Sequence, residues 1–439
     1  MYINNLIIEP DSSPPKQKPS QNNDLRSIID NSPTKPAKDS SNPTNSKPNK
    51  PDQPDQSPSS KPVKPTEKEP EFDEALFNEY FASTPEPKQF EKPFLSLSEM
   101  ELGKLRPGKK AISDDPKAVD VVYTYVDASD TYWKKARNDI MTSADFSKES
   151  QWRDTKELLF SLRSLLKHVS FIRHVYIVVS APTQIPSWLD SNHPHVTIVY
   201  HTEIFPDRSY LPTFNSLSIE ANIWRIPGLS DNFLYLNDDF FVGRDVPYRY
   251  FFDNAMGVVH VERYWFPKPD STFYHNNIYE ASTILKSHFG FGRETQAGTY
   301  RAIMHAPKLL NRIAANFTSS VFYDAYHISS MARFRQPKGT PYFVGMMSHS
   351  WVQESFRSPG FFSTSAKYHR CSPSEFRFEY MKNNPGELKL MGQRIGRIRP
   401  QFYCVNNDLE SQTEEASKMF IDVMKGLYPD KSPWEKESV

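Results

Sequence analysis

Two pairs of aspartates stand directly after apolar runs that are typical of buried β-strands. Asp127 and Asp130 follow the run VDVVYTYV. Asp238 and Asp239 follow the run FLYLN. A single aspartate at such a position is more often a turn or cap residue. Two pairs favour a site, because crowded carboxylates repel each other unless a cation lies among them. Mg²⁺ binds in this way, through one or two carboxylates and the oxygens of a phosphate.

The runs that carry the aspartates belong to an alternating pattern of strands and helices. The apolar runs at 172–180 and 195–201 are typical of strands buried on both faces. Helices are predicted from about Asp154, where Glu157 completes a capping-box pattern, and from Asn215 to residue 226. This order predicts an α/β fold, a Rossmann-like core with a largely parallel central sheet flanked by helices. The carboxyl ends of its strands form the ligand crevice, so all four aspartates are expected at one rim.

Composition divides the chain before the first strand. Of the 37 prolines, 17 precede residue 94. Residues 1–92 are therefore predicted to be a disordered Pro/Ser/Lys-rich tether, 93–118 a linker that packs on the domain, and 119–430 the folded domain. Lys+Arg and Asp+Glu both number 53, so no net charge favours nucleic acid. No stretch approaches the roughly 18 to 20 apolar residues that cross a bilayer.

The two cysteines and the missing motifs narrow the reaction class further. Cys371 and Cys404 are compatible with one disulfide bridge or with two buried free thiols, and both alternatives stay open. The chain contains no GxxxxGK[ST], GxGxxG, HExxH or GxSxG motif. Nucleoside triphosphatase, dinucleotide oxidoreductase, zinc protease and serine hydrolase activities therefore lose their main support.

Four ordered blocks resemble the conserved regions of the Stealth family. VDVVYTYVDASD resembles the opening region, and the long block from WRDTKELLF to NDDFFVG resembles the second. MHAPKLLNRI with MARFRQ is similar to the third region, and FYCVNND to the fourth. The family includes bacterial capsular polysaccharide phosphotransferases and the eukaryotic N-acetylglucosamine-1-phosphotransferase. The blocks together cover most of residues 119–408.

The resemblance implies a reaction and a set of site residues. A sugar 1-phosphate would pass from a nucleotide diphosphate sugar, such as UDP-GlcNAc, to a hydroxyl of a glycan or glycoprotein acceptor, with release of a nucleoside monophosphate. The metal, Mg²⁺ or Mn²⁺, would be held by Asp238, Asp239 and Asp408. The family's catalytic positions correspond to His305, Arg335 and Asp239, and its substrate-binding positions to Asp127, Asp130, Arg153, Asp154 and Asn406.

The chemistry of these residue types agrees with phosphoryl transfer. Asp238, Asp239 and Asp408 are hard oxygen ligands. Arg335 can hold a phosphoryl group with two parallel hydrogen bonds. Arg333 is also an arginine and could do the same, so only the resemblance selects Arg335. His305 could deprotonate the acceptor hydroxyl or attack phosphorus itself, and without the motif a histidine at a helix start is more often a cap.

The sequence alone is also compatible with two other functions. An ordinary metal-dependent glycosyltransferase would use the same donor class and release a nucleoside diphosphate. A binding module with a decayed site is disfavoured because the acidic and basic site residues are intact. The tether suits the stem of a Golgi or secretory-lumen enzyme in a eukaryote, and otherwise a cytoplasmic location is expected. Membrane association would then need a missing anchor or a partner, and a homodimer stays open.

Overall fold

The computed structural model describes residues 119–141, 152–263, 273–290, 295–296, 299–336, 339–382, 384–409 and 414–436. The predicted tether and linker lie outside these residues and stay predictions. Within the described part of the chain, no helix is both long and apolar enough to cross a membrane.

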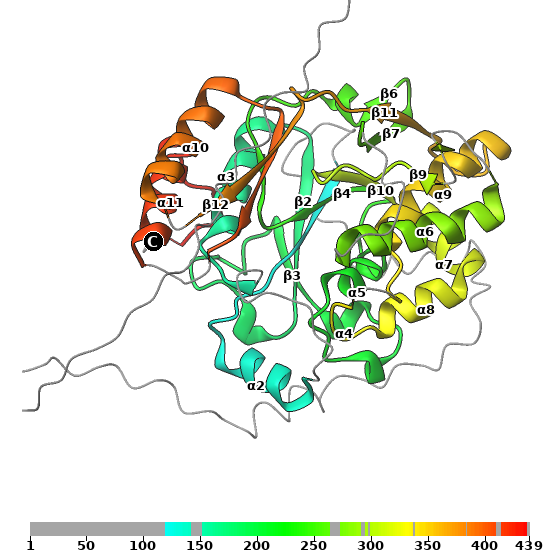
Figure 1. Cartoon of the computed structure of the whole chain (residues 1–439), viewed down its shortest axis with the longest axis horizontal. Coiled ribbons are helices and arrows are strands. Elements are labelled where there is room, and N and C mark those ends of the chain that lie inside the picture. The colour runs from blue at the N-terminus through cyan, green and yellow to red at the C-terminus, as the bar shows by residue number, and fades with distance from the viewer. Residues whose placement is uncertain are drawn as a thin grey trace, which may run out of the picture. The chain divides into compact units, whose positions relative to one another are not determined.

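A five-stranded sheet forms the centre of the described structure (Figure 1). Its strands lie in the order β10 (Lys308–Asn311), β4 (Asn232–Asn237), β1 (Val119–Thr124), β2 (Ile172–Val179) and β3 (Val196–Tyr200). The first four strands along the chain run parallel, and β10 is antiparallel to β4. The largely parallel α/β fold predicted from the sequence is therefore confirmed.

The neighbouring strands β1 and β4 determine where the predicted ligand crevice lies. Thr124, the last residue of β1, lies opposite Asn237, the last residue of β4. The chain proceeds outward from β1 through β2 to β3 and then returns to the other side of β1 at β4. The direction of winding reverses between β1 and β4, and such a switch point opens a crevice beyond the carboxyl ends of the strands. Asp127 and Asp238 follow those two ends.

Smaller sheets extend the molecule from the edge of the crevice. One contains β12 (Phe376–Met381), β13 (Phe402–Asn407) and β5 (Phe240–Val242), and another contains β11 (Ala366–Arg370), β7 (Met256–Val261) and β6 (Phe252–Asp253). The strands β8 (Thr295–Gln296) and β9 (Thr299–Tyr300) form a hairpin. Because β5 follows β4 after a two-residue turn and pairs with β13, residues far apart in sequence meet there.

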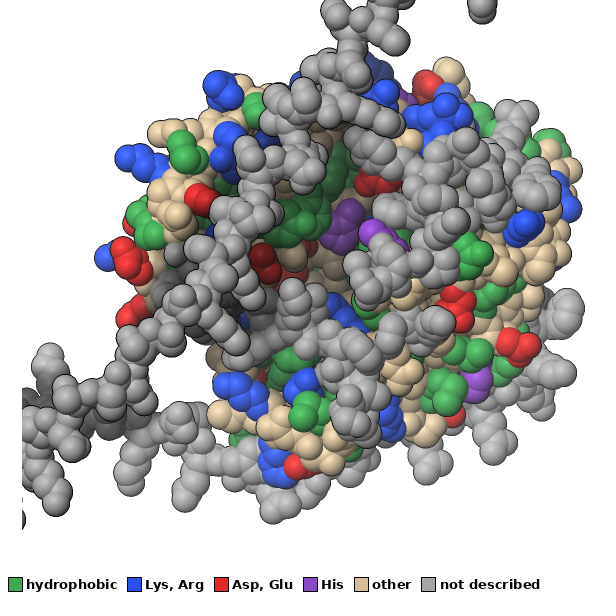
Figure 2. All heavy atoms as spheres, viewed as in Figure 1, with side chains coloured by type: hydrophobic (Ala, Val, Ile, Leu, Met, Phe, Trp, Pro, Cys, Tyr) green, Lys and Arg blue, Asp and Glu red, His purple; other side chains and the backbone are tan. Residues whose placement is uncertain are grey.

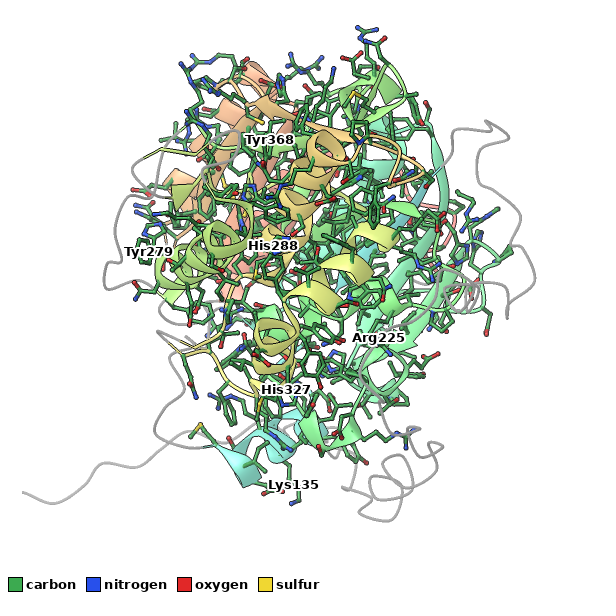
Figure 3. The ribbon with its side chains drawn as sticks, turned by 90° about the vertical axis from the view of Figure 1, so that its right-hand side faces the viewer. Lys135, Arg225, Tyr279, His288, His327 and Tyr368 are labelled. Atoms are coloured by element: carbon green, nitrogen blue, oxygen red, sulfur yellow. The ribbon has the colours of Figure 1, made fainter. Side chains whose placement is uncertain are left out.

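Helices lie on both sides of the central sheet. The elements α10 (Pro385–Ile398) and α11 (Glu414–Leu427) pack together on one side in Figure 1. The other side carries α6 (Phe273–Phe289), α7 (Arg312–Val321), α8 (Tyr323–Met331) and α9 (Phe343–Arg357). The turned view in Figure 3 shows this second group from outside, with His288 labelled on α6 and His327 on α8. The remaining α-helices are α2 (Thr131–Ile140), α3 (Glu157–His168), α4 (His201–Ile204) and α5 (Ser216–Glu220).

The predicted helix starts are confirmed in one case and wrong in the other. Asn215 caps α5, its side chain accepting from the backbone of Leu217 at 3.2 Å, although the helix ends at Glu220 and a 3₁₀ turn follows. The capping box at Asp154 is wrong. Lys156 precedes α3 with a φ of 66°, in the left-handed region, and turns Asp154 away from the helix end.

A second, smaller aromatic cluster lies beside the main core. It consists of Trp133, Trp152, Phe214 and Phe334, each buried. The Trp133 and Trp152 ring centroids are 5.6 Å apart, and Phe214 stacks on Phe334 at 5.6 Å. The two cysteines are free and buried, so the structure takes the free-thiol alternative.

A buried ion pair fastens the C-terminal segment to α3. Arg163 donates two hydrogen bonds to Glu435, at 2.8 and 2.6 Å, and a third to the Tyr428 carbonyl at 3.1 Å. The side chains of the pair are only 7% and 0% exposed. An arginine left there without its partner would be an uncompensated charge inside the protein.

We expect Glu435→Ala to lower the free energy of unfolding by about 3 kcal/mol, because it leaves Arg163 buried and unpaired. Urea denaturation followed by circular dichroism measures this change. The control is Asp139→Ala, which removes the exposed pair with Lys135 and is expected to cost less than about 0.5 kcal/mol. Equal effects of the two substitutions would contradict the assigned role of the buried pair.

Candidate functional site

A cavity of about 720 Å³ opens beyond the carboxyl ends of β1 and β4. Thr124 and Asn237, the last residues of those strands, line it together with Asp238 and Asp239. In Figure 2, acidic and histidine side chains gather in a central hollow beside hydrophobic ones. The cavity therefore lies where the strand order of the sheet predicts a ligand crevice.

The predicted site residues divide between this cavity and a neighbour. The larger cavity is lined by Asp238, Asp239, His305, Arg335 and Asn406. A second cavity of about 650 Å³ is lined by Asp127, Arg153 and Asp154, and it shares Trp133 and Trp152 with the first. Asp130 and Asp408 line neither cavity.

Four carboxylates interact electrostatically: Asp238 and Asp239 line the larger cavity, Asp154 lines the smaller one, and Glu157 lines neither. Burial raises the pKa of every one, since the surrounding protein withdraws them from bulk water. The pKa of Asp154 rises to about 6 through burial and the charge of Asp127. Burial likewise raises the pKa of Asp239 to about 6. The pKa of Asp238 is raised by burial and by the charges of Asp239 and Asp154.

Hydrogen bonds fix two of these carboxylates where α3 begins. Asp154 accepts from the backbone of Lys156 at 2.9 Å and from the hydroxyl of Tyr125. Glu157 accepts from the backbone of Thr155 and from the side-chain amide of Asn407 at 3.5 Å. Both carboxylates are therefore held by hydrogen bonds beside the left-handed residue Lys156 and not by a capping box.

Asp239 is fixed from the opposite side by β13. The thiol of Cys404 donates to its carboxylate at 3.1 Å, and the backbone of Val405 donates to its carbonyl at 3.1 Å. Asp239, His305 and Cys404 each offer one ligand atom, and these atoms lie within 4.8 Å of one another. This is one of two groups in the described residues with the composition and spacing of a metal site.

Two basic side chains, Lys308 and Arg335, interact electrostatically with Asp239. Burial lowers the pKa of Lys308 to about 8, although the negative charges of Glu220 and Asp239 partly offset this decrease. Arg335 donates to the hydroxyl of Ser216 at 3.0 Å, and its guanidinium lies 5.8 Å from the centre of the Phe273 ring. The pKa of Glu220 is raised by burial, while Lys308 and Arg335 partly offset that rise.

Arg335 and Arg333, which the sequence alone leaves equivalent, have different surroundings. Arg335 lines the larger cavity. Arg333 does not line it and donates to the backbone carbonyl of Ser209 at 2.5 Å. The geometry therefore agrees with the selection of Arg335.

His305 lies in the loop before β10 and not at the start of a helix as expected. Its ring packs against Phe240, Phe378 and Tyr274, with centroid distances of 4.8, 5.8 and 5.9 Å. Burial, aided by the charge of Lys308, lowers its pKa to about 3. The imidazole is therefore neutral at physiological pH and carries a lone pair for accepting a proton, attacking an electrophile or binding a metal.

The first aspartate pair separates into two environments. Asp127 faces the smaller cavity and accepts from the backbone and the hydroxyl of Ser129 at 2.8 and 2.7 Å. Asp130 caps α2 through Tyr132 at 2.9 Å and accepts from Thr183 and Gln184. The expectation of four aspartates at one rim is therefore wrong for Asp130, because its carboxylate is engaged in capping and in a contact with the next loop.

Asn406 and Asp408, both from the fourth region, differ in their position relative to the larger cavity. Asn406 lines the larger cavity. Asp408 follows β13, with its backbone donating to Met381 at 3.0 Å, and is not in the metal-capable group of Asp239. Its role as a metal ligand stays a prediction, as does the binding of substrate by Arg153, which donates to the Leu409 carbonyl at 3.3 Å.

Sequence reasoning missed several polar residues of the site. Glu157 gives a sequence signal, but a misleading one, since its spacing from Asp154 is that of a capping box. Lys308, Glu220 and Cys404 give none, because a lysine in a strand or a glutamate in a helix becomes informative only when its burial is known. All four are buried.

The donor set fits a divalent cation. Carboxylates outnumber the cationic side chains that line the larger cavity. Burial is the main reason why the pKa values of Asp238 and Asp239 are raised, because it disfavours their charged forms. A hard divalent ion accepts carboxylate oxygens and would offset their mutual repulsion. Asp238 and Asp239 are the adjacent carboxylates that would hold it.

Comparisons with known proteins agree with this arrangement. Residues 151–260 match the family model described as Stealth protein CR2, conserved region 2. An exopolysaccharide phosphotransferase of Streptomyces coelicolor is 31% identical over 329 residues, which are 73% of this chain and 52% of that protein. The mouse N-acetylglucosamine-1-phosphotransferase subunits alpha/beta are 47% identical over 108 residues, 25% of this chain and 9% of that protein.

Other matches are shorter or weaker. The capsular polysaccharide phosphotransferase LcbA of Neisseria meningitidis is 36% identical over 176 residues, 39% of this chain and 46% of that protein. Among solved structures, the galactosyltransferase LgtC in complex with donor and acceptor sugar analogues has a TM-score of 0.35 at 8% identity, covering 72% of this chain and 98% of that one. That structural likeness is too low to support a conclusion.

The match to the family model covers the segment that contains Asp154, Asp238 and Asp239. The chain spans about half the length of the exopolysaccharide phosphotransferase from Streptomyces coelicolor. It contains the second conserved region, which ends beyond Asp238 and Asp239. The chain therefore belongs to the Stealth family.

Proposed function

We propose that this chain is a metal-assisted transferase that moves a sugar 1-phosphate from a nucleotide diphosphate sugar to a hydroxyl of an acceptor glycan. The observation that carries this proposal is the meeting of Asp238, Asp239, His305 and Arg335 in one cavity. The names of the similar proteins support the same reaction class. UDP-GlcNAc as the donor and a secretory lumen as the location remain expectations from the sequence.

Asp238 and Asp239 would hold Mg²⁺ or Mn²⁺ and, through the ion, the diphosphate of the donor. Asp238 and Asp239 supply carboxylate oxygens, which are the ligands these ions prefer. A bound divalent cation neutralises charge that builds on the phosphoryl oxygens during displacement. Asp154 and Glu157 interact with Asp238 and would strengthen the negative field that attracts the ion.

The basic side chains would contact the phosphoryl group that is transferred. Arg335 has a planar fork of donors that suits two phosphate oxygens. Lys308 lies near Asp239 and Glu220 and would keep a positive charge close to the same region. Positioning and charge stabilisation are the main tasks in phosphoryl transfer, because the protein has little covalent chemistry to perform.

His305 would supply the reactive nitrogen. Its low pKa keeps the ring neutral, so it can take the proton of the acceptor hydroxyl or attack phosphorus. In the second case, the N–P bond forms as the bond to the nucleotide oxygen breaks, and the acceptor hydroxyl later displaces the histidine. The two routes differ in stereochemistry at phosphorus, with inversion for one displacement and retention for two.

An aromatic strip on β12 would receive the acceptor sugar. Phe376, Phe378 and Tyr380 alternate along the strand and all line the larger cavity. Phe378 and Tyr380 are 38% and 50% exposed, with ring centroids 5.0 Å apart. Phe378 lies 5.8 Å from His305, so a sugar lying on the strip would bring a hydroxyl toward the reactive nitrogen.

Identification of the released nucleotide tests the proposed reaction. We expect incubation with UDP-sugars, an oligosaccharide acceptor and Mg²⁺ or Mn²⁺ to release UMP together with a phosphodiester product, measured by mass spectrometry. Asp239→Ala and His305→Ala are expected to give neither product while keeping the native circular dichroism spectrum. Release of UDP with a glycosidic product would instead support the metal-dependent glycosyltransferase.

We expect Arg335→Ala to lower kcat/KM by about 100-fold or more, because a charge-stabilising donor is lost from the phosphoryl site. Arg333→Ala is the matched control and is expected to change kcat/KM by less than about threefold, since Arg333 lies outside the cavity. Arg335→Lys keeps the charge but loses the planar fork, so partial activity is expected. Similar losses in the two alanine variants would refute the assignment.

The raised carboxylate pKa values predict a pH-dependent response to metal. A carboxylate whose folded pKa is raised stabilises the fold fully below its unfolded pKa of 3.8, and this contribution is lost as pH rises through about 6. We therefore expect saturating Mg²⁺ or Mn²⁺ to raise the Tm at about pH 7.5 and to have little effect at about pH 5.

Differential scanning fluorimetry of the metal-stripped protein measures the Tm at both pH values. Asp238→Asn should reduce the metal-induced gain, whereas Asp139→Asn, which changes an exposed aspartate on α2, should preserve it. A metal-induced gain of equal size at both pH values would count against a carboxylate-based metal site.

A further inference from the structure

A cluster of metal-ligating side chains lies outside both cavities, at the end of β11. His369, Cys371 and Glu375 each offer one ligand atom, and these atoms lie within 4.8 Å of one another. The His369 Nε2 atom is 2.8 Å from a carboxylate oxygen of Glu375. None of the three residues lines either cavity, so the cluster is not part of the proposed transferase site.

A fourth residue, His260, neighbours His369, although it is not in the group whose ligand atoms lie within 4.8 Å of one another. His260 on β7 is 6% exposed, and its Nε2 atom is buried without a hydrogen-bond partner among the described residues. It pairs directly with His369 in the parallel register of β7 and β11. A buried polar atom that is left unpaired is costly, so its presence calls for a partner that a metal ion would supply.

The spacing of the two histidines suits a shared ion. Their ring centroids are 5.3 Å apart, with 73° between the ring planes. Two imidazoles that bind one tetrahedral Zn²⁺ through nitrogens at about 2.0–2.1 Å have centroids roughly 5 to 6 Å apart. The observed separation therefore allows both rings to face one ion.

The alternation of β11 directs its side chains to opposite faces of the strand. Tyr368, labelled in Figure 3, bonds His349 of α9 at 2.8 Å, whereas His369 next to it bonds Glu375. Consecutive strand residues point to opposite faces, and paired residues of neighbouring strands point to the same one. His260 and His369 are therefore presented on the face that also holds Cys371 and Glu375.

We propose that His260, His369, Cys371 and Glu375 bind one Zn²⁺ ion as a structural site. Two borderline imidazoles, one soft thiolate and one hard carboxylate form a four-ligand set that suits zinc and is poor for Mg²⁺. All four positions come from the protein, which is typical of a structural site and not of a catalytic one. His369 is 44% exposed on its side chain and gives the ion a route from solvent.

A metal-free explanation accounts for part of the cluster only. The bond between His369 and Glu375 satisfies those two residues, and Glu375 also accepts from the backbone of Ser372 at 2.5 Å. Tyr250 hydrogen-bonds to Cys371 and Glu375, and its ring stacks on His260 at 4.2 Å. None of these contacts provides a partner for the buried Nε2 atom of His260.

The ion would join two of the smaller sheets. His260 and His369 belong to β7 and β11, whereas Glu375 immediately precedes β12 and its carbonyl accepts from Phe402 of β13 at 2.8 Å. A bond network through one ion would fix the start of β12. That strand carries the aromatic strip of the larger cavity, so the ion would position the strip without contacting a substrate.

Zinc content tests the proposal independently of any activity. We expect the full-length protein, equilibrated with buffered Zn²⁺ and desalted, to retain about one ion per chain by plasma mass spectrometry. Cys371→Ser and His260→Ala should each lose it, and so should His369→Ala, whose exposed position makes misfolding a poor explanation. His327→Ala, on α8 in Figure 3, is the matched control and should retain zinc.

Cobalt spectroscopy identifies the ligating thiol. The chain has two cysteines, so in a Cys404→Ser variant the thiolate-to-cobalt absorption reports Cys371 alone. We expect that absorption in Cys404→Ser and its loss in the variant lacking both thiols. Absence of zinc from the wild-type protein would overturn the proposal. Zinc that persists in Cys371→Ser and His260→Ala but disappears in Asp239→Ala would overturn it too, since the ion would then belong to the cavity.

Discussion

Mutual repulsion among acidic side chains is the constraint on which the rest of the site depends. Asp154, Glu157 and Asp238 approach one another where the surrounding protein has removed much of the water that would screen them. Such a group is tolerable when it takes up protons or when a cation joins it. The positions of Lys308 and Arg335 make sense in this light, because they offset part of the negative charge while a divalent ion would offset the remainder.

The backbone brings these acids together from two separate segments of the chain. The two-residue turn between β4 and β5 places Asp238 and Asp239 at the end of a central strand, and the pairing of β5 with β13 sets Cys404 against Asp239. The left-handed residue Lys156 redirects the chain before α3. The sheet therefore supplies the position of the site, whereas irregular backbone beside it supplies the orientation of the side chains.

Much of the fold could be predicted because the signal for each central strand is local. The apolar runs before Asp127 and Asp238 identified two strands of the sheet, whereas the adjacency of those strands is a finding of the structure. The surroundings of Asp130 and His305 could not be predicted because they depend on distant partners, and the capping of α3 by Asp154 failed because of the local backbone at Lys156. Asp130 is bonded by Gln184, and the backbone at Lys156 takes Asp154 out of its capping pattern. The burial that gives His305 its low pKa likewise comes from rings elsewhere in the chain.

The linings of the two cavities share two tryptophan side chains. Trp133 and Trp152 face both spaces, and the guanidinium of Arg137 rests on the Trp152 ring at 4.2 Å. A ligand long enough to occupy both cavities would therefore lie against these two indoles.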